Sequence, residues 1–309
     1  MRDRAAPIAI FAAFVLVPFL PWGGAYNLAV ALMARAAVFG LAALSLDFIL
    51  GVGGMVSFGH AAFFVIGAYA TTILDANHID GAAPVFATAA IASAFFALVT
   101  GAVALRTRGV NFIMITLAFA QMVYFAAGSL ADYGGDDGYT LAARTTLLGR
   151  SVYYWMCLAI LLTAYLLCRR VVASRFGRVL RAIKQNRRRV QALGFDAWMY
   201  QLVAYVIAAT LCGLAGVLLA NSAEFVSPAY GAWQRSGDLL IMVILGGAGS
   251  LHGAVVGSIA VVLLEEVLGR FTEHWRLIYG PLLILSVLYV RGGLAAMSAG
   301  RPGYLGRDF

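Results

Sequence analysis

Apolar segments of membrane-spanning length dominate this chain. Hydrophobic residues make up 62% of its 309 residues and charged residues only 12%, whereas soluble domains carry roughly 25% charged residues. A soluble core of this size cannot hide so much apolar surface, so we predict an integral membrane protein. Because a spanning helix needs about 20 apolar residues, ten such helices would leave only short loops and no room for a soluble catalytic domain.

The order of these segments predicts an all-α fold with about ten transmembrane helices, or eight at the fewest, in one transmembrane domain over residues 1–309. The predicted spans are 7–20, 28–50, 51–74, 85–105, 110–130, 151–168, 199–220, 236–250, 254–268 and 278–290. The first also resembles a signal peptide, but no cleavage site fits well after it. We therefore expect it to be retained. The eighth is short and least certain.

The positive residues predict an orientation in which both termini are cytoplasmic. In that arrangement 16 Lys or Arg residues fall on the cytoplasmic side and five outside, and Arg35 lies within a span. The five are Arg144, Arg150, Arg235, Arg270 and Arg276. Lys and Arg accumulate in cytoplasmic loops, which favours this orientation over its inverse. Arg35 and Asp47 share the second span about 18 Å apart, so we expect each to find a partner on another span.

A glycine-rich segment follows the second span. Residues 51–60 hold four glycines together with Ser57 and His60, and glycine lowers helix stability by about 1 kcal/mol relative to alanine. We expect a broken helix here, either lining a cavity or packing closely against another helix. GGMVSF (53–58) and GGAGSL (246–251) share a pattern, which is weak support for an internal repeat.

The long polar interval lies at residues 169–198. Nine of the 22 Lys and Arg residues fall between Arg169 and Arg189, with no acid among them. Within it Phe176, Val179, Leu180 and Ile183 recur at helical spacing. We predict an amphipathic helix, with Ser174 as its N-cap and Gly194 at its end. The alternatives for its apolar stripe are a lipid headgroup surface and a groove on a partner protein.

Several chemistries are excluded by the residues present. Lys184 is the only lysine and follows Ile183, so a GxxxxGK[ST] phosphate loop does not occur, and ATP would have to be bound by another chain. No HExxH or GxSxG motif occurs, and Glu265 and Glu266 should point apart on a helix. Asp136 lies in an external glycine-rich loop that lacks a complete calcium pattern. The chain is therefore not expected to be an enzyme or to hold a cofactor.

Three stretches resemble the permease subunits of branched-chain amino acid ABC importers of the LivM type. They are LSLDFILGVGGMVSFGHAAFFVIGAYA (44–70), SRFGRVLRAIKQNRRRVQALGFDAWMYQLVAYVIAATLCGLAGVL (174–218) and SGDLLIMVILGGAGSLHGAVVGSIAVVLLEEVLG (236–269). The resemblance covers about residues 28 to 292. Asp47 stands where this family usually has Asn.

The resemblance implies the rest of a transport machine. It implies a second homologous permease, two ATP-binding subunits, a periplasmic substrate-binding protein and a place in the bacterial inner membrane. It implies alternating access, with leucine, isoleucine and valine as the default substrates and urea or short amides as an alternative. On this basis we expect the polar interval to contain the coupling helix that contacts the ATPase.

These expectations assign residues to two roles. The predicted substrate path consists of Ser57, His60, Tyr69, Thr116, Gln121 and Ser250, because a zwitterion crossing the bilayer needs hydrogen-bond partners. The predicted coupling residues are Phe176, Gly177, Arg178, Val179, Leu180, Arg181, Ile183 and Gly194. Of these, Arg178 and Arg181 should meet acids on the ATPase, Gly177 should allow close approach to it, and Arg187–Arg189 should meet headgroups. The competing function is an ion-coupled secondary transporter that uses Arg35, Asp47 and His60.

Overall fold

The computed structural model describes residues 2–19, 26–79, 81–141, 149–271, 274, 277–281 and 293–294, which are largely helical. The α-helices are α1 (Arg2–Leu16), α2 (Tyr26–Asp47), α3 (His60–Ala76), α4 (Ala82–Ala104), α5 (Val110–Gly128), α6 (Gly149–Ala173), α7 (Arg175–Ala192), α8 (Ala197–Ala223), α9 (Trp233–Gly246) and α10 (Leu251–Phe271). The short elements are η1 (Val17–Phe19), the π-helical turn η3 (Phe48–Val52), η4 (Ala131–Tyr133), η5 (Pro228–Gly231), β1 (Tyr139–Thr140) and β2 (Phe225–Val226).

Six helices are long and apolar enough to cross a membrane. They are Tyr26–Val52, Ala82–Ala104, Val110–Gly128, Val152–Ala173, Ala197–Ala223 and Leu251–Phe271, and shorter apolar helices lie at Pro7–Phe19 and His60–Ala76. This confirms an all-α membrane protein. A total near ten stays a prediction, because α9 has 14 residues and the last predicted span, 278–290, lies mostly outside the described residues.

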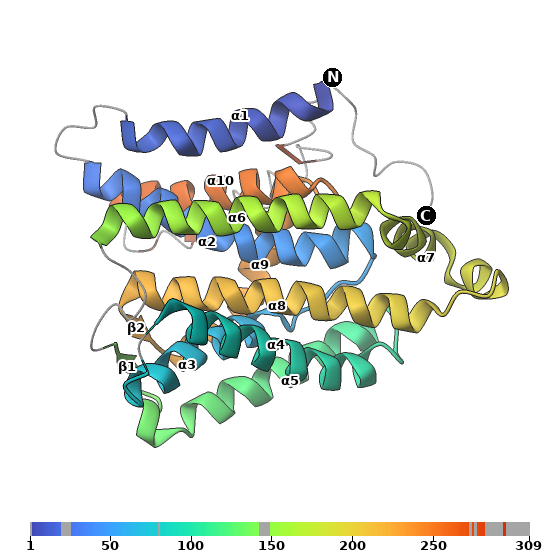
Figure 1. Ribbon diagram of the computed structural model, residues 1–309, viewed down its shortest axis with the longest axis horizontal. Coiled ribbons are helices and arrows are strands. Elements are labelled where there is room, and N and C mark those ends of the chain that lie inside the picture. The colour runs from blue at the N-terminus through green and yellow to red at the C-terminus, as the bar shows by residue number, and fades with distance from the viewer. Residues whose placement is uncertain are drawn as a thin grey trace.

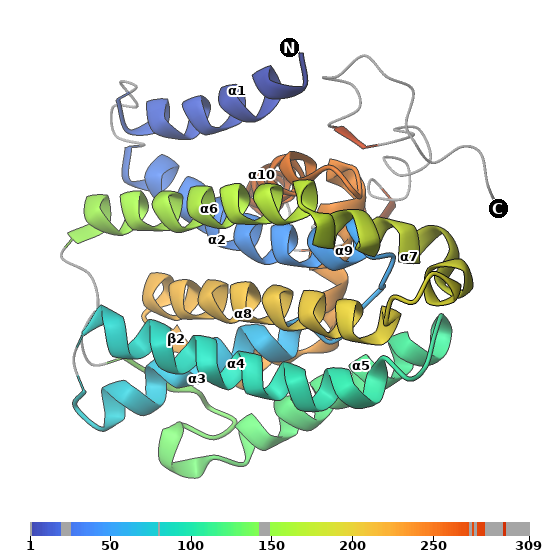
Figure 2. The same ribbon diagram turned by 45° about the vertical axis from the view of Figure 1, so that its right-hand side comes forward.

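Helix α8 lies at the centre of the packing. It runs between a layer containing α2, α6 and α10 and a layer containing α3, α4 and α5 (Figures 1 and 2), and it packs directly on α2, α3 and α4. A methyl group on Gly216 would meet the backbone carbonyl of Phe64, and one on Gly67 would meet that of Gly213. Small residues permit such close approach of membrane helices. The packing interpretation therefore holds for Gly67, in the part of the predicted 51–74 span that follows residues 51–60.

Gly216→Ala is expected to destabilise the fold by about 1–3 kcal/mol, because the added methyl overlaps main-chain atoms of α3 that cannot rotate away. Gly237→Ala is the matched control, since no atom lies within 4 Å of a methyl group at that position. Thermal unfolding of the two purified variants in detergent measures the difference. Equal melting temperatures would contradict this packing.

The helix breaks after α2, as the glycines predicted. α2 runs into η3, the chain leaves helical geometry after Gly53, and α3 begins at His60. Gly54 has φ +70°, a left-handed conformation that favours glycine. The N–H and C=O groups of irregular backbone within a membrane need hydrogen-bond partners from protein or water. Side chains of this chain supply some of those partners here.

The two ends of the bundle differ in charge. α7 lies at one end (Figure 1). The positive charge of Arg187 there lies near that of Arg108 in the α4–α5 turn. At the opposite end β1 pairs antiparallel with β2, with Tyr139 opposite Val226. The Tyr139 hydroxyl donates a hydrogen bond to the Asp75 carboxylate at that end. This asymmetry agrees with the distribution of positive residues along the sequence.

The predicted boundaries between residues 221 and 250 are partly wrong. α8 continues to Ala223, and α9 begins at Trp233 instead of within the 236–250 span. Arg235, which the predicted topology placed outside, therefore belongs to α9, and its guanidinium lies over the ring of Phe39 in α2. The first six residues of α9 (WQRSGD) include four polar or charged side chains and a glycine between Gln234 and Asp238, so hydropathy did not indicate a helix there. In the fold Arg235 and Asp238 form an ion pair within α9.

Candidate functional site

Three of the predicted path residues meet where the broken segment passes α5. Thr116 Oγ1 accepts a hydrogen bond from Phe58 N at 3.2 Å, and Ser57 Oγ accepts one from Gly59 N at 3.1 Å, so both hydroxyls satisfy the broken backbone. His60 is fully buried, and neither of its ring nitrogens has a hydrogen-bond partner among the described residues. A buried unpartnered imidazole is unfavourable unless a polar group approaches it, which keeps His60 a path candidate.

The other three path residues are not gathered around His60. Tyr69 lies two and a half turns further along α3, on the opposite side of the helix, in a separate apolar cluster with Leu141. Gln121 lies on α5 with its Nε2 buried and without a partner among the described residues. Ser250 lies between α9 and α10, where its hydroxyl donates to main chain at 2.7 Å. Their part in one path stays a prediction.

Asp47 joins the two glycine motifs. Its side chain has no exposed surface, and its Oδ1 accepts a hydrogen bond from Gly249 N at 2.6 Å. A methyl group on Gly51 would meet both the Gly249 backbone and the Asp47 carboxylate. The expectation that Asp47 pairs with another segment is confirmed. The glycine-rich segment 51–60 and the GGAGSL motif therefore lie in contact at the end of the bundle near α7.

Lys184 connects this junction to α7. Its Nζ donates a hydrogen bond to Gly51 O at 2.9 Å, and its aliphatic stem lies where a side chain on Gly54 would be. The charged face of α7 thus contacts the broken segment directly. No motif in the sequence pointed to this contact, which depends on the π-helical turn η3 presenting a carbonyl group to the side of the helix.

The apolar stripe of α7 is not open to a partner. Leu180 has no exposed surface and Ile183 is 4% exposed, and Phe176 stacks on Tyr200 of α8 at 5.4 Å between ring centroids. The expectation that this stripe fills a partner groove is corrected, because the stripe anchors α7 to the bundle. The exposed residues of α7 are mainly polar: Arg175, Arg178, Arg181, Lys184, Gln185, Asn186, Arg188, Arg189 and Gln191.

The corner between α6 and α7 is braced by this chain's own groups. Gly177 packs against the backbone of Val172, so its close approach is internal and not to a partner. Arg181 donates to Val172 O at 2.9 Å and to Gly177 O at 3.3 Å while it remains exposed, so its contact with acids of an ATPase stays a prediction. Ser174 occupies the N-cap position, but its hydroxyl donates to Val171 O at 2.6 Å and does not cap α7. Gly194 follows the C-cap residue Leu193 at φ +88°, as predicted for a glycine at the end of this helix.

Helix α7 is also kinked. Asn186 has φ −156° and ψ 97°, outside helical geometry, and its Oδ1 accepts a hydrogen bond from Arg189 N at 3.0 Å. The amide therefore caps a second short helical turn after the kink. The kink separates Arg175 and Arg178 on one arm from Arg188 and Arg189 on the other.

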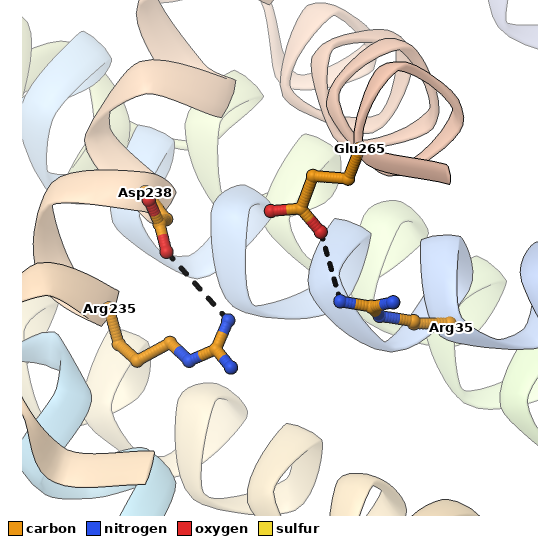
Figure 3. A network of polar contacts seen from close by, with 4 residues as sticks. All are labelled: Arg35, Arg235, Asp238 and Glu265. Carbon is orange, nitrogen blue, oxygen red and sulfur yellow. Dashed lines mark hydrogen bonds and ion pairs between the residues drawn. The ribbon is translucent and has the colours of Figure 1, made fainter. Parts of the chain in front are cut away.

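Charged side chains from three helices meet near the middle of α2 (Figure 3). Arg35 Nη2 lies 2.9 Å from Glu265 Oε2 of α10, and Arg235 Nη1 lies 3.7 Å from Asp238 Oδ2 within α9. The expectation that Arg35 finds a partner on another span is confirmed. Glu266 instead pairs with Arg270, so the two adjacent glutamates do point apart. We call Arg35, Arg235, Asp238 and Glu265 the charged quartet.

Other binding chemistries have little support in the described part of the chain. No group of three or more His, Cys, Asp or Glu residues that the structure describes could hold a metal ion. A cavity of about 490 Å³ opens between the first turns of α2 and the end of α8, and its walls include Asn27, Tyr153 and Glu224. None of the predicted path residues lines that cavity.

These features define a multi-pass membrane protein with a broken helix, buried polar groups at depth and a basic surface helix. Residues 28–287 match the family described as branched-chain amino acid transport system, permease component. The chain therefore belongs to this family of permeases.

Several permease proteins are similar to this chain over most of its length. The LivM permease protein of the high-affinity branched-chain amino acid transport system of Salmonella typhimurium is 24% identical, covering 96% of this chain and 76% of the relative. A probable LivM of Methanocaldococcus jannaschii is 25% identical over 83% of this chain and 84% of its own. LivH of Salmonella typhimurium is 23% identical over 85% of this chain and 92% of its own. No solved structure matches the chain.

Proposed function

We propose that this chain is a permease subunit of an ABC importer that moves branched-chain or related hydrophobic amino acids across the bacterial inner membrane. The family match and the names of the relatives support the substrate class. The break between α2 and α3 is linked through Lys184 to the basic surface helix α7. This contact supports a transporter whose conformational change is driven by an ATPase bound at that surface. The 309 residues hold no phosphate-binding loop, so ATP is bound by separate subunits.

The proposed assembly contains two permeases, two ATP-binding subunits and a periplasmic binding protein. Matches to both LivM and LivH support a second permease of similar fold. α7 is the coupling helix, and its exposed arginines face the ATPase while its apolar stripe holds it to α6 and α8. Co-purification with a candidate ATP-binding subunit from the same organism tests the assembly. An ion-coupled transporter would be recovered without one.

The single lysine provides a test of orientation. Lys184 lies on the exposed side of α7, and the proposed topology puts it in the cytoplasm together with both termini. A membrane-impermeant amine reagent should therefore label the chain in inside-out vesicles and not in right-side-out ones. Lys184→Arg controls for labelling of the amino terminus. Labelling of Lys184 from outside would overturn the orientation and with it the role of α7.

A further inference from the structure

Two cations meet one aromatic ring at the middle of the membrane. Phe39 lies 13 residues from each end of the Tyr26–Val52 span. The Arg35 guanidinium carbon is 5.6 Å from the centre of the Phe39 ring, and that of Arg235 is 5.8 Å away. Both are within the range of cation–π attraction. Figure 3 shows the two guanidinium groups directed toward each other between α9 and α2.

These arginines do not reach for the membrane surface. Arg35 bends toward Glu265 and toward Phe39, which is one turn deeper in the span. In the isolated chain the Arg35 side chain remains 40% exposed and that of Arg235 33% exposed. A charged side chain facing lipid at this depth is strongly unfavourable. The open side of the quartet must therefore face water or a polar group.

The quartet carries complementary charges that a ligand can engage. Its two cations and two anions sum to zero, which matches a zwitterion. Arg35 and Glu265 form a close pair at 2.9 Å, whereas Arg235 and Asp238 are 3.7 Å apart, beyond hydrogen-bond distance. A guanidinium has five donors in a fork that suits a carboxylate. Because Asp238 does not occupy all the donors of Arg235, the Arg235 guanidinium can also bind a carboxylate.

The quartet also lies beside the broken helix. Ser236, between Arg235 and Asp238, accepts a hydrogen bond from Ala61 N at 3.1 Å. Phe39 stacks on Phe64 of α3, with 6.0 Å between centroids and 19° between planes. The starts of α3 and α9 thus meet at the depth of Phe39. Interrupted helices that begin at mid-membrane are where transporters place their substrates.

We propose that the charged quartet is a binding site for the carboxylate and ammonium groups of an α-amino acid, with the Phe39 ring as its floor. The guanidinium groups of Arg35 and Arg235 take the carboxylate, and Asp238 and Glu265 take the ammonium. This proposal rests on the proposed function, and adds that the site recognises the charged backbone of the substrate while leaving its side chain to other surfaces.

The first test is uptake of radiolabelled leucine by the assembled transporter in proteoliposomes. Arg35→Gln and Arg235→Gln should each lower uptake roughly 10- to 100-fold, the size of a lost hydrogen bond to a charged group, with the complex assembled and ATP hydrolysis retained. The double variant Arg35→Glu with Glu265→Arg restores an ion pair but moves the guanidinium to α10. Uptake should stay low in it. Wild-type uptake in either single variant, or full rescue by the exchanged pair, would show that the pair is only structural.

The second test does not depend on transport. Arg235→Cys introduces a thiol into a chain whose own Cys157, Cys168 and Cys212 are 1%, 1% and 0% exposed. A positively charged thiosulfonate reagent should label it faster than a negatively charged one, because loss of Arg235 leaves Asp238 and Glu265 with Arg35 alone as their counter-charge. Leucine should slow the labelling at a concentration raised about 100-fold to offset the lost Arg235 contact. Leu193→Cys, 70% exposed in the turn between α7 and α8, is the control and should be unaffected by leucine.

The outcomes separate the two proposals. If the wild-type complex shows no ATP-driven uptake of amino acids, the proposed function fails, and the labelling test alone decides whether the quartet binds leucine. If the wild-type complex transports leucine but the new thiol at position 235 is not protected even at the raised leucine concentration, the proposed function stands and the quartet proposal is overturned.

Discussion

Arg175→Glu combined with Arg178→Glu is expected to abolish binding of the ATP-binding subunit and to leave the membrane fold intact. Both arginines are exposed on α7, and neither guanidinium group has a hydrogen bond or ion pair among the described residues. Reversing two charges at a contact replaces attraction with repulsion, which costs several kcal/mol. Association is measured by co-purification from detergent, and folding by the melting temperature of the permease alone.

Two further variants make this result specific. Arg188→Ala with Arg189→Ala, on the other arm of the kinked helix, should leave association nearly unchanged, because headgroups are expected to meet that arm. Leu180→Asp should lower the amount of folded protein, since it places a carboxylate where no surface is exposed. If the double glutamate variant still assembles an active complex, α7 does not dock through this face.

Lys184→Met is expected to uncouple ATP hydrolysis from transport. Methionine keeps much of the apolar stem beside Gly54 but removes the donor to Gly51 O. Loss of a hydrogen bond from a charged group is worth about 1.5–3 kcal/mol, so uptake should fall about tenfold or more while ATP hydrolysis continues. The ratio of ATP hydrolysed to leucine transported therefore rises.

The control for Lys184→Met is Gln185→Met, at the next exposed position of α7. It changes a polar side chain to methionine without touching the broken segment. An unchanged ratio of hydrolysis to uptake in Lys184→Met would mean that motion of α7 reaches the bundle by another route, such as the braced α6–α7 corner.

The sequence predicted the elements whose signals are local. Apolar length gave most of the spanning helices, the glycines gave the break before His60, and the spacing of Phe176 and Leu180 gave a helix. The prediction was wrong about what covers the apolar residues of that helix. A stripe of apolar residues on a polar helix indicates burial, but periodicity alone does not say whether the cover is another protein, lipid or, as here, α6 and α8.

Contacts between distant segments were harder to predict. Arg35 and Asp47 were expected to have partners because an unpaired charge at that depth is unfavourable, but nothing in the chain named Glu265 or Gly249 as those partners. Arg235 was assigned to an external loop because the start of α9 is polar. An arginine, a serine and an aspartate at 235, 236 and 238 could have indicated a half-membrane helix that begins at a polar site.

The most direct test of the account is leucine uptake into proteoliposomes that contain this chain, its partner permease, the ATP-binding subunits and the soluble binding protein. We predict that uptake requires ATP on the side of the vesicle membrane that corresponds to the cytoplasm. Uptake should stop when the ATP-binding subunits are omitted. Uptake driven by an ion gradient with no ATP and no ATP-binding subunit would contradict the account.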